Sequence, residues 1–188
     1  MINNKTVIIF TTYRSGSTAL GQLIGKNIRR IQPIPELLNP HDEDKIPVAQ
    51  TILSSGQYVV TSIMPDHLKD YFDSFLYGLD TYNIKLTRKD QIARIVSLYV
   101  AVKLNKFQFF KKETIDPYTL PIDLELIDDQ INLVKELDRL AEQTDIKYDA
   151  TIDYEDIKPL LNTTSIRQFI KPDNWDELYS IVKKRYYI

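Results

Sequence analysis

Short apolar runs alternate along this chain with longer segments in which apolar residues recur at helical spacing. Residues 5–12 are β-branched and aromatic, show no helical period and end at a cluster of Ser and Gly, which predicts a short buried strand. The same reasoning predicts strands over 58–63, 83–87 and 148–154. A run as uniformly apolar as the first is typical of a central strand in a parallel sheet.

Segments of helical periodicity follow these strands. The predicted helices cover 17–30, 65–76, 90–104, 123–142, 155–161 and 175–185. Three strand–helix units in succession favour a parallel sheet with helices packed on its faces. We therefore predict a three-layer α/β fold with a central parallel sheet of about four strands, formed by residues 1–188 as a single domain.

One stretch departs from this alternation. Residues 32–47 hold four of the nine prolines, and prolines at this density predict a long irregular segment at the surface. Loops of this length in compact domains often carry binding or catalytic residues.

Composition excludes several functional classes. Lys plus Arg number 24 and Asp plus Glu 26, a net charge of −2, which excludes a generic basic nucleic-acid binder. The chain has no Cys and two His, so it has no thiolate metal site or Cys nucleophile, and we expect no metal. The apolar run at 7–10 is too short for a signal sequence or a membrane span, so we expect a cytoplasmic protein without a membrane partner.

The segment between the first strand and its helix is the first candidate for chemistry. It reads Thr-Tyr-Arg-Ser-Gly-Ser-Thr over 12–18. Backbone N–H groups, hydroxyls and the positive end of a helix can converge there on a phosphate or sulfate ester, with Gly16 permitting a sharp turn and Arg14 adding charge. The Gly-Lys-Ser/Thr ending of the usual nucleotide P-loop is missing. The equally open alternative is that Ser15 and Ser17 only cap the helix.

A second candidate lies at the end of the predicted strand 83–87. Arg88 follows that strand, and Ser97 lies about two turns into the next helix. Ligands of parallel α/β sheets bind outside the carboxyl ends of the strands, so Arg88 should open to the same side as the 12–18 loop. Two anion contacts on one edge suggest a ligand with two anionic groups. The competing hypothesis is a surface ion pair of Arg88 with Asp90, and a solvated Ser97.

Together these residues resemble the sulfotransferase family that uses 3′-phosphoadenosine 5′-phosphosulfate (PAPS). Its 5′-phosphosulfate loop reads Lys/Arg-Ser-Gly-Ser/Thr-Thr, which residues 14–18 match. Its 3′-phosphate motif is an Arg after a later strand and a Ser in the following helix, as at Arg88 and Ser97. The sequence Tyr-Glu-Asp at 154–156 is similar to a further landmark of the family.

The resemblance implies a P-loop nucleotide hydrolase-like sulfotransferase fold and a metal-independent transferase. The donor would be PAPS, the product adenosine 3′,5′-bisphosphate, and the acceptor a hydroxyl of a carbohydrate or another small molecule. The implied donor-binding residues are Arg14, Ser15, Gly16, Ser17, Thr18, Arg88 and Ser97, with Arg167 and Lys171 in a final basic loop.

The catalytic base differs from that of the best-known branch of the family. That branch has Lys-Thr-His at the end of the second strand, where this chain has Thr61-Ser62-Ile63. The pattern is closer to the bacterial branch resembling trehalose sulfotransferases, whose base is a Glu after the first helix, here Glu36. The resemblance thus implies catalysis by Glu36 and Arg14. Apart from the resemblance, His67 is a fallback base, although its position predicts the exposed face of the helix after Pro65.

Two other functions remain open from the sequence. A nucleotide-dependent phosphotransferase of the kinase type could use the same loop, although no magnesium-binding carboxylate is evident after a strand. A non-catalytic nucleotide-binding protein could keep the loop without the base. The motifs fix neither the acceptor nor the oligomeric state.

Overall fold

The computed structural model describes residues 6–34, 58–64, 80–107, 117–161 and 171–188. Its strands are β1 (Thr6–Phe10), β2 (Ile31–Pro33), β3 (Tyr58–Ile63), β4 (Thr81–Thr87) and β5 (Ala150–Asp153). Its helices are α1 (Ser17–Asn27), α4 (Gln91–Lys103), α5 (Leu124–Glu142), α6 (Tyr154–Leu161) and α7 (Trp175–Tyr186). The helix predicted over 65–76 lies outside the described residues.

The strands form one parallel sheet with β1 at its centre. The order is β2-β3-β1-β4-β5, and every neighbouring pair runs parallel. Phe10 at the end of β1 is in register with Ile63 of β3 and with Lys85 of β4. The carboxyl ends of the three central strands therefore meet at one edge, and the predicted α/β class with a parallel sheet is confirmed.

The sheet has five strands, one more than the approximately four that the sequence predicted. The additional strand, β2, begins just before the segment that was predicted to be irregular from residue 32 onward, so that prediction is wrong for 32–33. The sequence signal was weak because the strand is three residues long and ends in Pro33. Proline lacks the N–H that a central strand needs, but an edge strand such as β2 can accommodate it.

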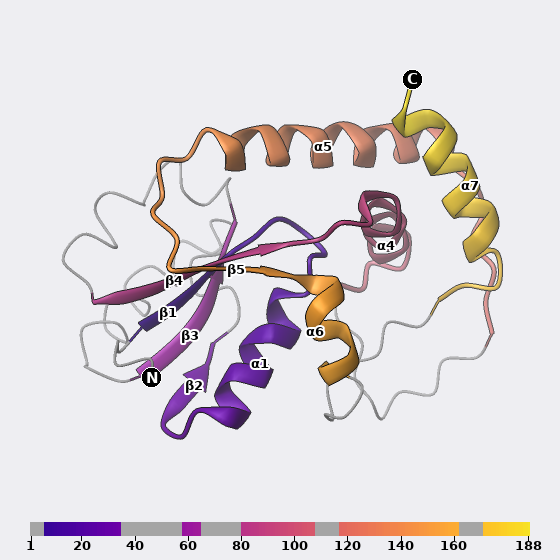
Figure 1. Ribbon diagram of the computed structural model, residues 1–188. Helices are drawn as coiled ribbons and strands as arrows, with labels where there is room; N and C mark the ends of the chain where they lie inside the picture. The colour runs from indigo at the N-terminus through magenta and orange to yellow at the C-terminus, as the bar shows by residue number, and fades with distance from the viewer. Residues whose placement is uncertain (1–5, 35–57, 65–79, 108–116, 162–170) are drawn as a thin grey trace.

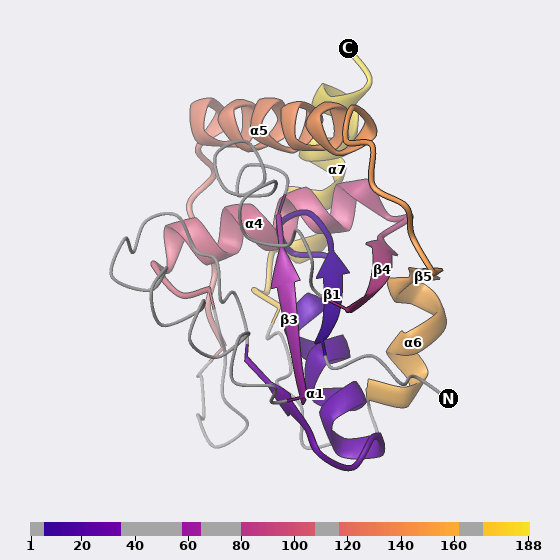
Figure 2. The same cartoon turned by 90° about the vertical axis from the view of Figure 1, so that its left-hand side faces the viewer.

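Helices cover the sheet from two sides (Figures 1 and 2). In Figure 1, α1 and α6 lie below the sheet and α5 lies above it, with α4 and α7 beside α5. The lower interface is apolar and contains Val7 and Ile9 of β1, Leu20 of α1 and Ile157 of α6. These contacts fix α1, and hence the loop that precedes it, against the central strand.

A second apolar cluster joins α4, α5 and α7. Its side chains follow the period of 3.6 residues and include Ile95 and Tyr99 of α4, Ile127 of α5, and Leu178 of α7, each of them fully buried. Two helices begin at aspartate caps: Asp90 accepts a hydrogen bond from the Ala93 N–H at 2.9 Å. The equivalent cap of α5 is Asp123.

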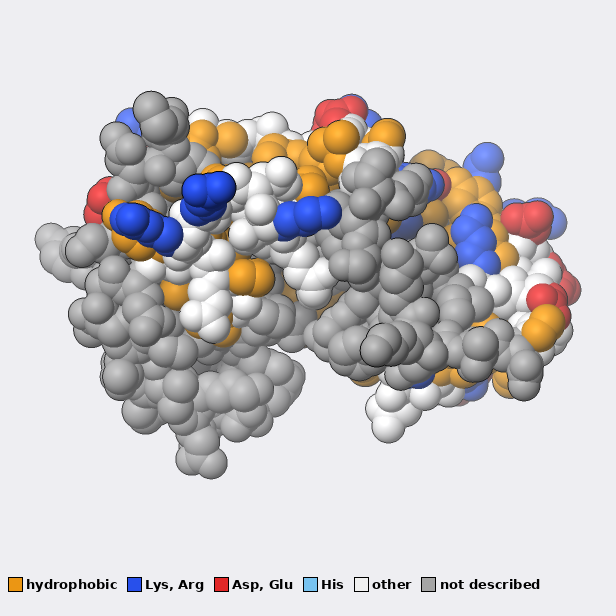
Figure 3. Space-filling view, turned by 90° about the horizontal axis from the view of Figure 1, so that it is seen from below, with side chains coloured by type: hydrophobic (Ala, Val, Ile, Leu, Met, Phe, Trp, Pro, Cys, Tyr) orange, Lys and Arg blue, Asp and Glu red, His pale blue; other side chains and the backbone are white. Residues whose placement is uncertain are grey.

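The outer surface is mixed in character. Figure 3 shows the side that carries α1, where Lys and Arg side chains on the described part are separated by uncharged and hydrophobic groups. No helix among the described residues combines the length and the apolar character needed to span a membrane.

Candidate functional site

The loop between β1 and α1 lies at the carboxyl edge of the sheet. Its start is tied to the neighbouring strand, because the Thr11 N–H donates to the Ile63 carbonyl at 3.0 Å. Its backbone is unusual: Arg14 has φ of 60° and Gly16 has φ of 91°, both in the left-handed region. For a residue with a Cβ this conformation is costly, so tertiary contacts must hold Arg14 in place.

The first turn of α1 begins without a side-chain cap. Its N-cap is Gly16, and no side chain accepts a hydrogen bond there. Ser15 is fully buried, and its hydroxyl lies 3.3 Å from that of Thr12. The interpretation that Ser15 and Ser17 act only as caps is therefore wrong. The first N–H groups of α1 donate to no capping side chain among the described residues and stay directed into the loop.

Arg14 joins the two segments that the sequence singled out. Its Nε donates to the Ser97 hydroxyl at 3.0 Å, and one of its terminal nitrogens donates to the Phe107 carbonyl at 2.6 Å. Ser97 is buried, with 4% of its surface exposed, so the prediction of a solvated Ser97 is wrong. The structure thus brings Arg14 and Ser97 together from two strand–helix units.

Arg88 lies on the same side and supports the loop. Its NH1 donates to the Arg14 carbonyl at 2.8 Å, and its guanidinium carbon lies 5.0 Å from the centre of the Tyr154 ring. Burial lowers the pKa of Arg88, while the acidic groups of Tyr154, Asp90 and Glu155 act in the opposite direction. Asp90 itself caps α4, so the two residues have separate structural roles rather than forming a simple surface ion pair.

The Tyr-Glu-Asp segment packs against both predicted motifs. A Cβ added at Gly16 would overlap the Tyr154 ring, so that ring lies directly on the loop glycine. The Glu155 carboxylate accepts hydrogen bonds from the backbone N–H groups of Lys89 and Asp90, at 3.1 and 3.2 Å. Tyr154 therefore lies between Gly16 and Arg88. Glu155 fixes the backbone of the turn between β4 and α4, from which the Arg88 side chain extends.

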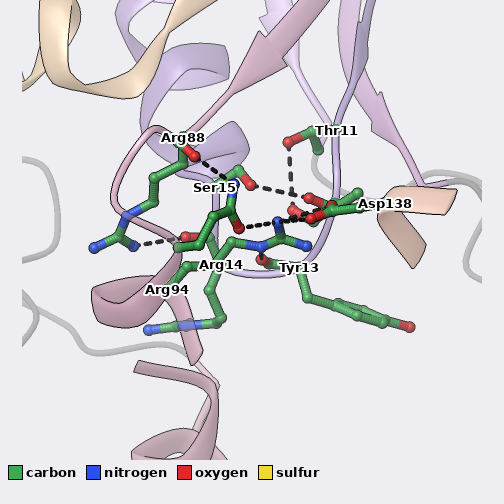
Figure 4. A network of polar contacts seen from close by, with 9 residues as sticks. Thr11, Tyr13, Arg14, Ser15, Arg88, Arg94 and Asp138 are labelled. Carbon is green, nitrogen blue, oxygen red and sulfur yellow. Dashed lines mark hydrogen bonds and ion pairs between the residues drawn. The ribbon is translucent and has the colours of Figure 1, made fainter. Parts of the chain in front are cut away.

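Sequence reasoning missed one residue of this cluster, Arg94. Its Nε donates to the Tyr13 carbonyl at 3.0 Å, and its NH1 lies 2.8 Å from an Asp138 carboxylate oxygen on α5 (Figure 4). The side chain is 2% exposed. A signal was present, because an arginine within the mostly apolar α4 must find polar partners when that helix is buried.

Two cavities open near the loop. The larger, about 210 Å³, lies beside Thr12, Arg88 and Arg94, and Phe10 and Tyr148 also line it. The smaller, about 60 Å³, lies between the first turn of α1 and the end of β3, and is lined by Ser17, Thr18, Thr61 and Ser62 among others. The buried Ser62 hydroxyl has no hydrogen-bond partner among the residues that the structure describes.

Glu36, His67 and Arg167 lie outside the described residues. Lys171 is described, and its ammonium lies 4.7 Å from the centre of the Trp175 ring at the start of α7. Within the described ranges, no group of three or more His, Cys, Asp and Glu side chains could hold a metal ion.

The chain resembles a solved kinase structure weakly and matches no family model. No family model and no curated protein matches this sequence. The crystal structure of shikimate kinase from Bacteroides thetaiotaomicron is similar at 12% identity and a TM-score of 0.46, over 97% of this chain and 96% of that chain. At this level the likeness carries nothing about the ligand or the reaction.

Proposed function

We propose that this protein binds a phosphorylated nucleotide at the 12–18 loop and transfers an anionic group from it to a hydroxyl acceptor. The observation that carries the proposal is the convergence of Arg14, Arg88 and Ser97 at one edge of a parallel sheet, beside an uncapped helix start. Cations, a helix N-terminus and oriented backbone amides together form an anion-binding arrangement.

The Arg14 guanidinium would contact the sulfuryl or phosphoryl group that is transferred. In this structure its guanidinium donates to two neutral acceptors, the Ser97 hydroxyl and the Phe107 carbonyl. A sulfate or phosphate oxygen is a stronger acceptor, because hydrogen bonds between charged partners are roughly twice as strong as neutral ones. Binding of the donor would therefore draw Arg14 toward the anion, where it would stabilise the charge that develops during transfer.

The finer form of the proposal names PAPS as the donor. The Ser-Gly-Ser-Thr part of the loop would bind the 5′-phosphosulfate, and Arg88 and Ser97 the 3′-phosphate, with Arg167 and Lys171 as further contacts. The acceptor oxygen would attack sulfur, the bond from sulfur to the 5′-phosphate oxygen would break, and Glu36 would take the acceptor proton. These roles follow from the family resemblance of the motifs.

Phosphoryl transfer of the kinase type is the second candidate. The strand order β2-β3-β1-β4-β5, with the loop after the central strand, is compatible with a phosphoryl donor as well as with a sulfuryl donor. In this case ATP would bind at the same loop, and its terminal phosphoryl group would be transferred. A nucleotide-binding protein without turnover is the third candidate function.

The cytoplasmic location expected from the sequence stays a prediction.

Thermal unfolding with a panel of nucleotides tests the binding step. A ligand at ~100 times its Kd adds about 2.7 kcal/mol, which raises the Tm of a chain of this size by roughly 5–10 °C. We expect this shift with adenosine 3′,5′-bisphosphate and a much smaller one with ATP, ADP or AMP. Arg14→Gln should abolish it. Arg185→Gln, on α7 in an ion pair with Asp128 of α5, is the matched control and should retain it.

Each result has a distinct meaning. Selective stabilisation by ATP would replace the sulfuryl donor with a phosphoryl donor, and no response to any nucleotide would contradict the proposed function. Turnover is tested separately with Glu36→Gln: loss of transfer with unchanged bisphosphate binding supports Glu36 as the base, and unchanged turnover removes it from the mechanism.

A further inference from the structure

Two consecutive carbonyl groups of the loop each face an arginine. The Tyr13 carbonyl accepts from Arg94 Nε at 3.0 Å, and the Arg14 carbonyl accepts from Arg88 NH1 at 2.8 Å. Both arginines belong to the segment that ends β4 and begins α4. The loop is thus held by its carbonyl oxygens, from one element of the fold.

This arrangement determines where the loop amides point. In a trans peptide the C=O and the following N–H are antiparallel, and the described residues contain no cis peptide bond. The N–H groups of Arg14 and Ser15 are therefore directed away from the two guanidinium groups. The left-handed backbone at Arg14 and again at Gly16 is of the kind that turns successive N–H groups into one concave anion seat.

Arg94 differs from Arg88 because it is almost fully buried, whereas Arg88 is half-buried. Its side chain is 2% exposed, and its terminal nitrogen NH1 contacts both carboxylate oxygens of Asp138, at 2.8 and 3.0 Å. The same nitrogen donates to the side chain of Gln91 at 2.7 Å. Figure 4 shows Arg94 extending toward Asp138, whereas the guanidinium groups of Arg14 and Arg88 extend in the opposite direction.

Asp138 is thus connected to the loop through one buried cation. Burial disfavours the charged form of Arg94 and lowers its pKa, while Asp138 opposes this shift. The Nε and NH1 atoms of Arg94 are paired, whereas its buried NH2 has no partner among the described residues, and Asp138 supplies a charge that offsets the buried cation. Loss of the Asp138 charge would let Arg94 move, and the Tyr13–Arg14 peptide would then be free to rotate.

We propose that Arg94 and Asp138 are positioning residues that orient the loop amides for anion binding, without contacting the anion. This rests on the proposed function, because it assumes that the loop binds an anion. It also assigns a role to α5: the helix supplies the carboxylate that fixes the loop through Arg94, at a distance from the bound group.

The test compares two aspartates of the same helix. Asp138→Asn removes the charge opposite Arg94, and Asp128→Asn removes the charge opposite Arg185, a pair that is more than one-third exposed on both sides. Affinity is measured by isothermal titration calorimetry with adenosine 3′,5′-bisphosphate and with inorganic pyrophosphate. Urea unfolding of each variant shows that it is folded.

We expect Asp138→Asn to weaken binding of both probes by about tenfold, and Asp128→Asn to change it less than twofold. Asp138→Glu, which restores a carboxylate, should recover part of the loss. In amide NMR spectra of the wild type, the Arg14 and Ser15 N–H signals should shift on titration, and this shift should shrink in Asp138→Asn. A merely stabilising ion pair would not change these signals selectively.

The outcomes separate the two proposals. Equal affinities of wild type and Asp138→Asn, with binding present in both, would overturn the positioning role and leave the proposed function standing. Absence of binding by the wild type would overturn the proposed function and this role with it. If Asp138→Asn does not fold, Arg94→Lys takes its place: lysine keeps the charge but cannot contact Tyr13 and Asp138 together, so the same tenfold loss is expected.

Discussion

Helix α4 borders two regions that are built on different principles. Toward α5 and α7 it presents Ile95, Tyr99 and other apolar side chains to a cluster in which Leu178 is fully buried. Toward the 12–18 loop it presents Arg94 and Ser97, which contact the loop through hydrogen bonds. The first region is stabilised by burial of apolar surface and the second by directed polar contacts.

The difference shows what each region tolerates. Apolar burial depends on area and volume, so a substitution that keeps both costs little. The loop depends on which atoms face one another, because a buried polar group that loses its partner is costly even when volume is conserved. Changes of volume should therefore reduce the stability of the helical cluster, whereas isosteric changes of charge should reduce binding at the loop.

Removing volume from the helical cluster should have the largest effect on stability. Leu178→Ala leaves a cavity among α4, α5 and α7, and should lower the free energy of unfolding by about 3–5 kcal/mol. Leu178→Met conserves volume and should cost under about 1.5 kcal/mol. Both are measured by urea unfolding. Equal losses of unfolding free energy in the two variants would show that the stability of this cluster does not depend on side-chain volume.

Adding volume to the loop should have the next largest effect. Gly16→Ala forces a Cβ into the Tyr154 ring at a φ of 91°, and should cost about 2–3 kcal/mol and abolish nucleotide binding. Combining it with Tyr154→Ala removes the overlap but not the backbone strain. We expect the second substitution to cost less in the Gly16→Ala background than in the wild type, as a double-mutant cycle of unfolding free energies would show. If the two losses of unfolding free energy simply add, Gly16 and Tyr154 are not in contact.

The helical cluster also contains a buried polar contact, at the Tyr99 hydroxyl, whose loss should reduce stability even though volume is conserved. The buried Tyr99 hydroxyl accepts from the Asp123 N–H at 3.1 Å and donates to the Pro121 carbonyl. Tyr99→Phe keeps the ring but leaves two backbone groups unpaired, and should lower the free energy of unfolding by about 1–2 kcal/mol. Tyr187→Phe, at an exposed position after α7, is the control and should have no measurable effect.

The smallest effect concerns pH. Burial acts to raise the pKa of the Glu155 carboxyl, but the N–H groups of Lys89, Asp90 and Glu155 together with the charge of Arg88 outweigh it, so the pKa is lowered. Glu155 therefore stabilises the fold above its unfolded pKa of about 4.3, and this contribution is lost as the pH falls through the lower folded pKa. The fall in Tm from pH 5 to pH 3 should be shallower in Glu155→Gln than in the wild type. Glu177→Gln, exposed on α7, should follow the wild type.

Much of the fold could be predicted from local pattern. The apolar run of β1, the β-branched and alternating patterns of β3 and β4, and the helical spacing of α4, α5 and α7 are visible in the sequence because each element repeats its own period. The three-residue strand β2 was missed because its pairing with β3 supplies what its sequence lacks. Among the site residues, the sequence singled out Arg14, Arg88 and Ser97, and the structure brings them together.

Local sequence was enough to determine the secondary-structure elements and the polar chemistry of the 12–18 loop, because side-chain type decides which segment forms a strand, a turn or a helix. The tertiary structure alone decided that Arg94 joins the loop to Asp138, and that Tyr154 lies on Gly16. These contacts join residues 44 to 138 positions apart in the chain. No local period encodes such a separation, because it depends on how the sheet order and the packing of α4 against α5 bring distant segments into contact.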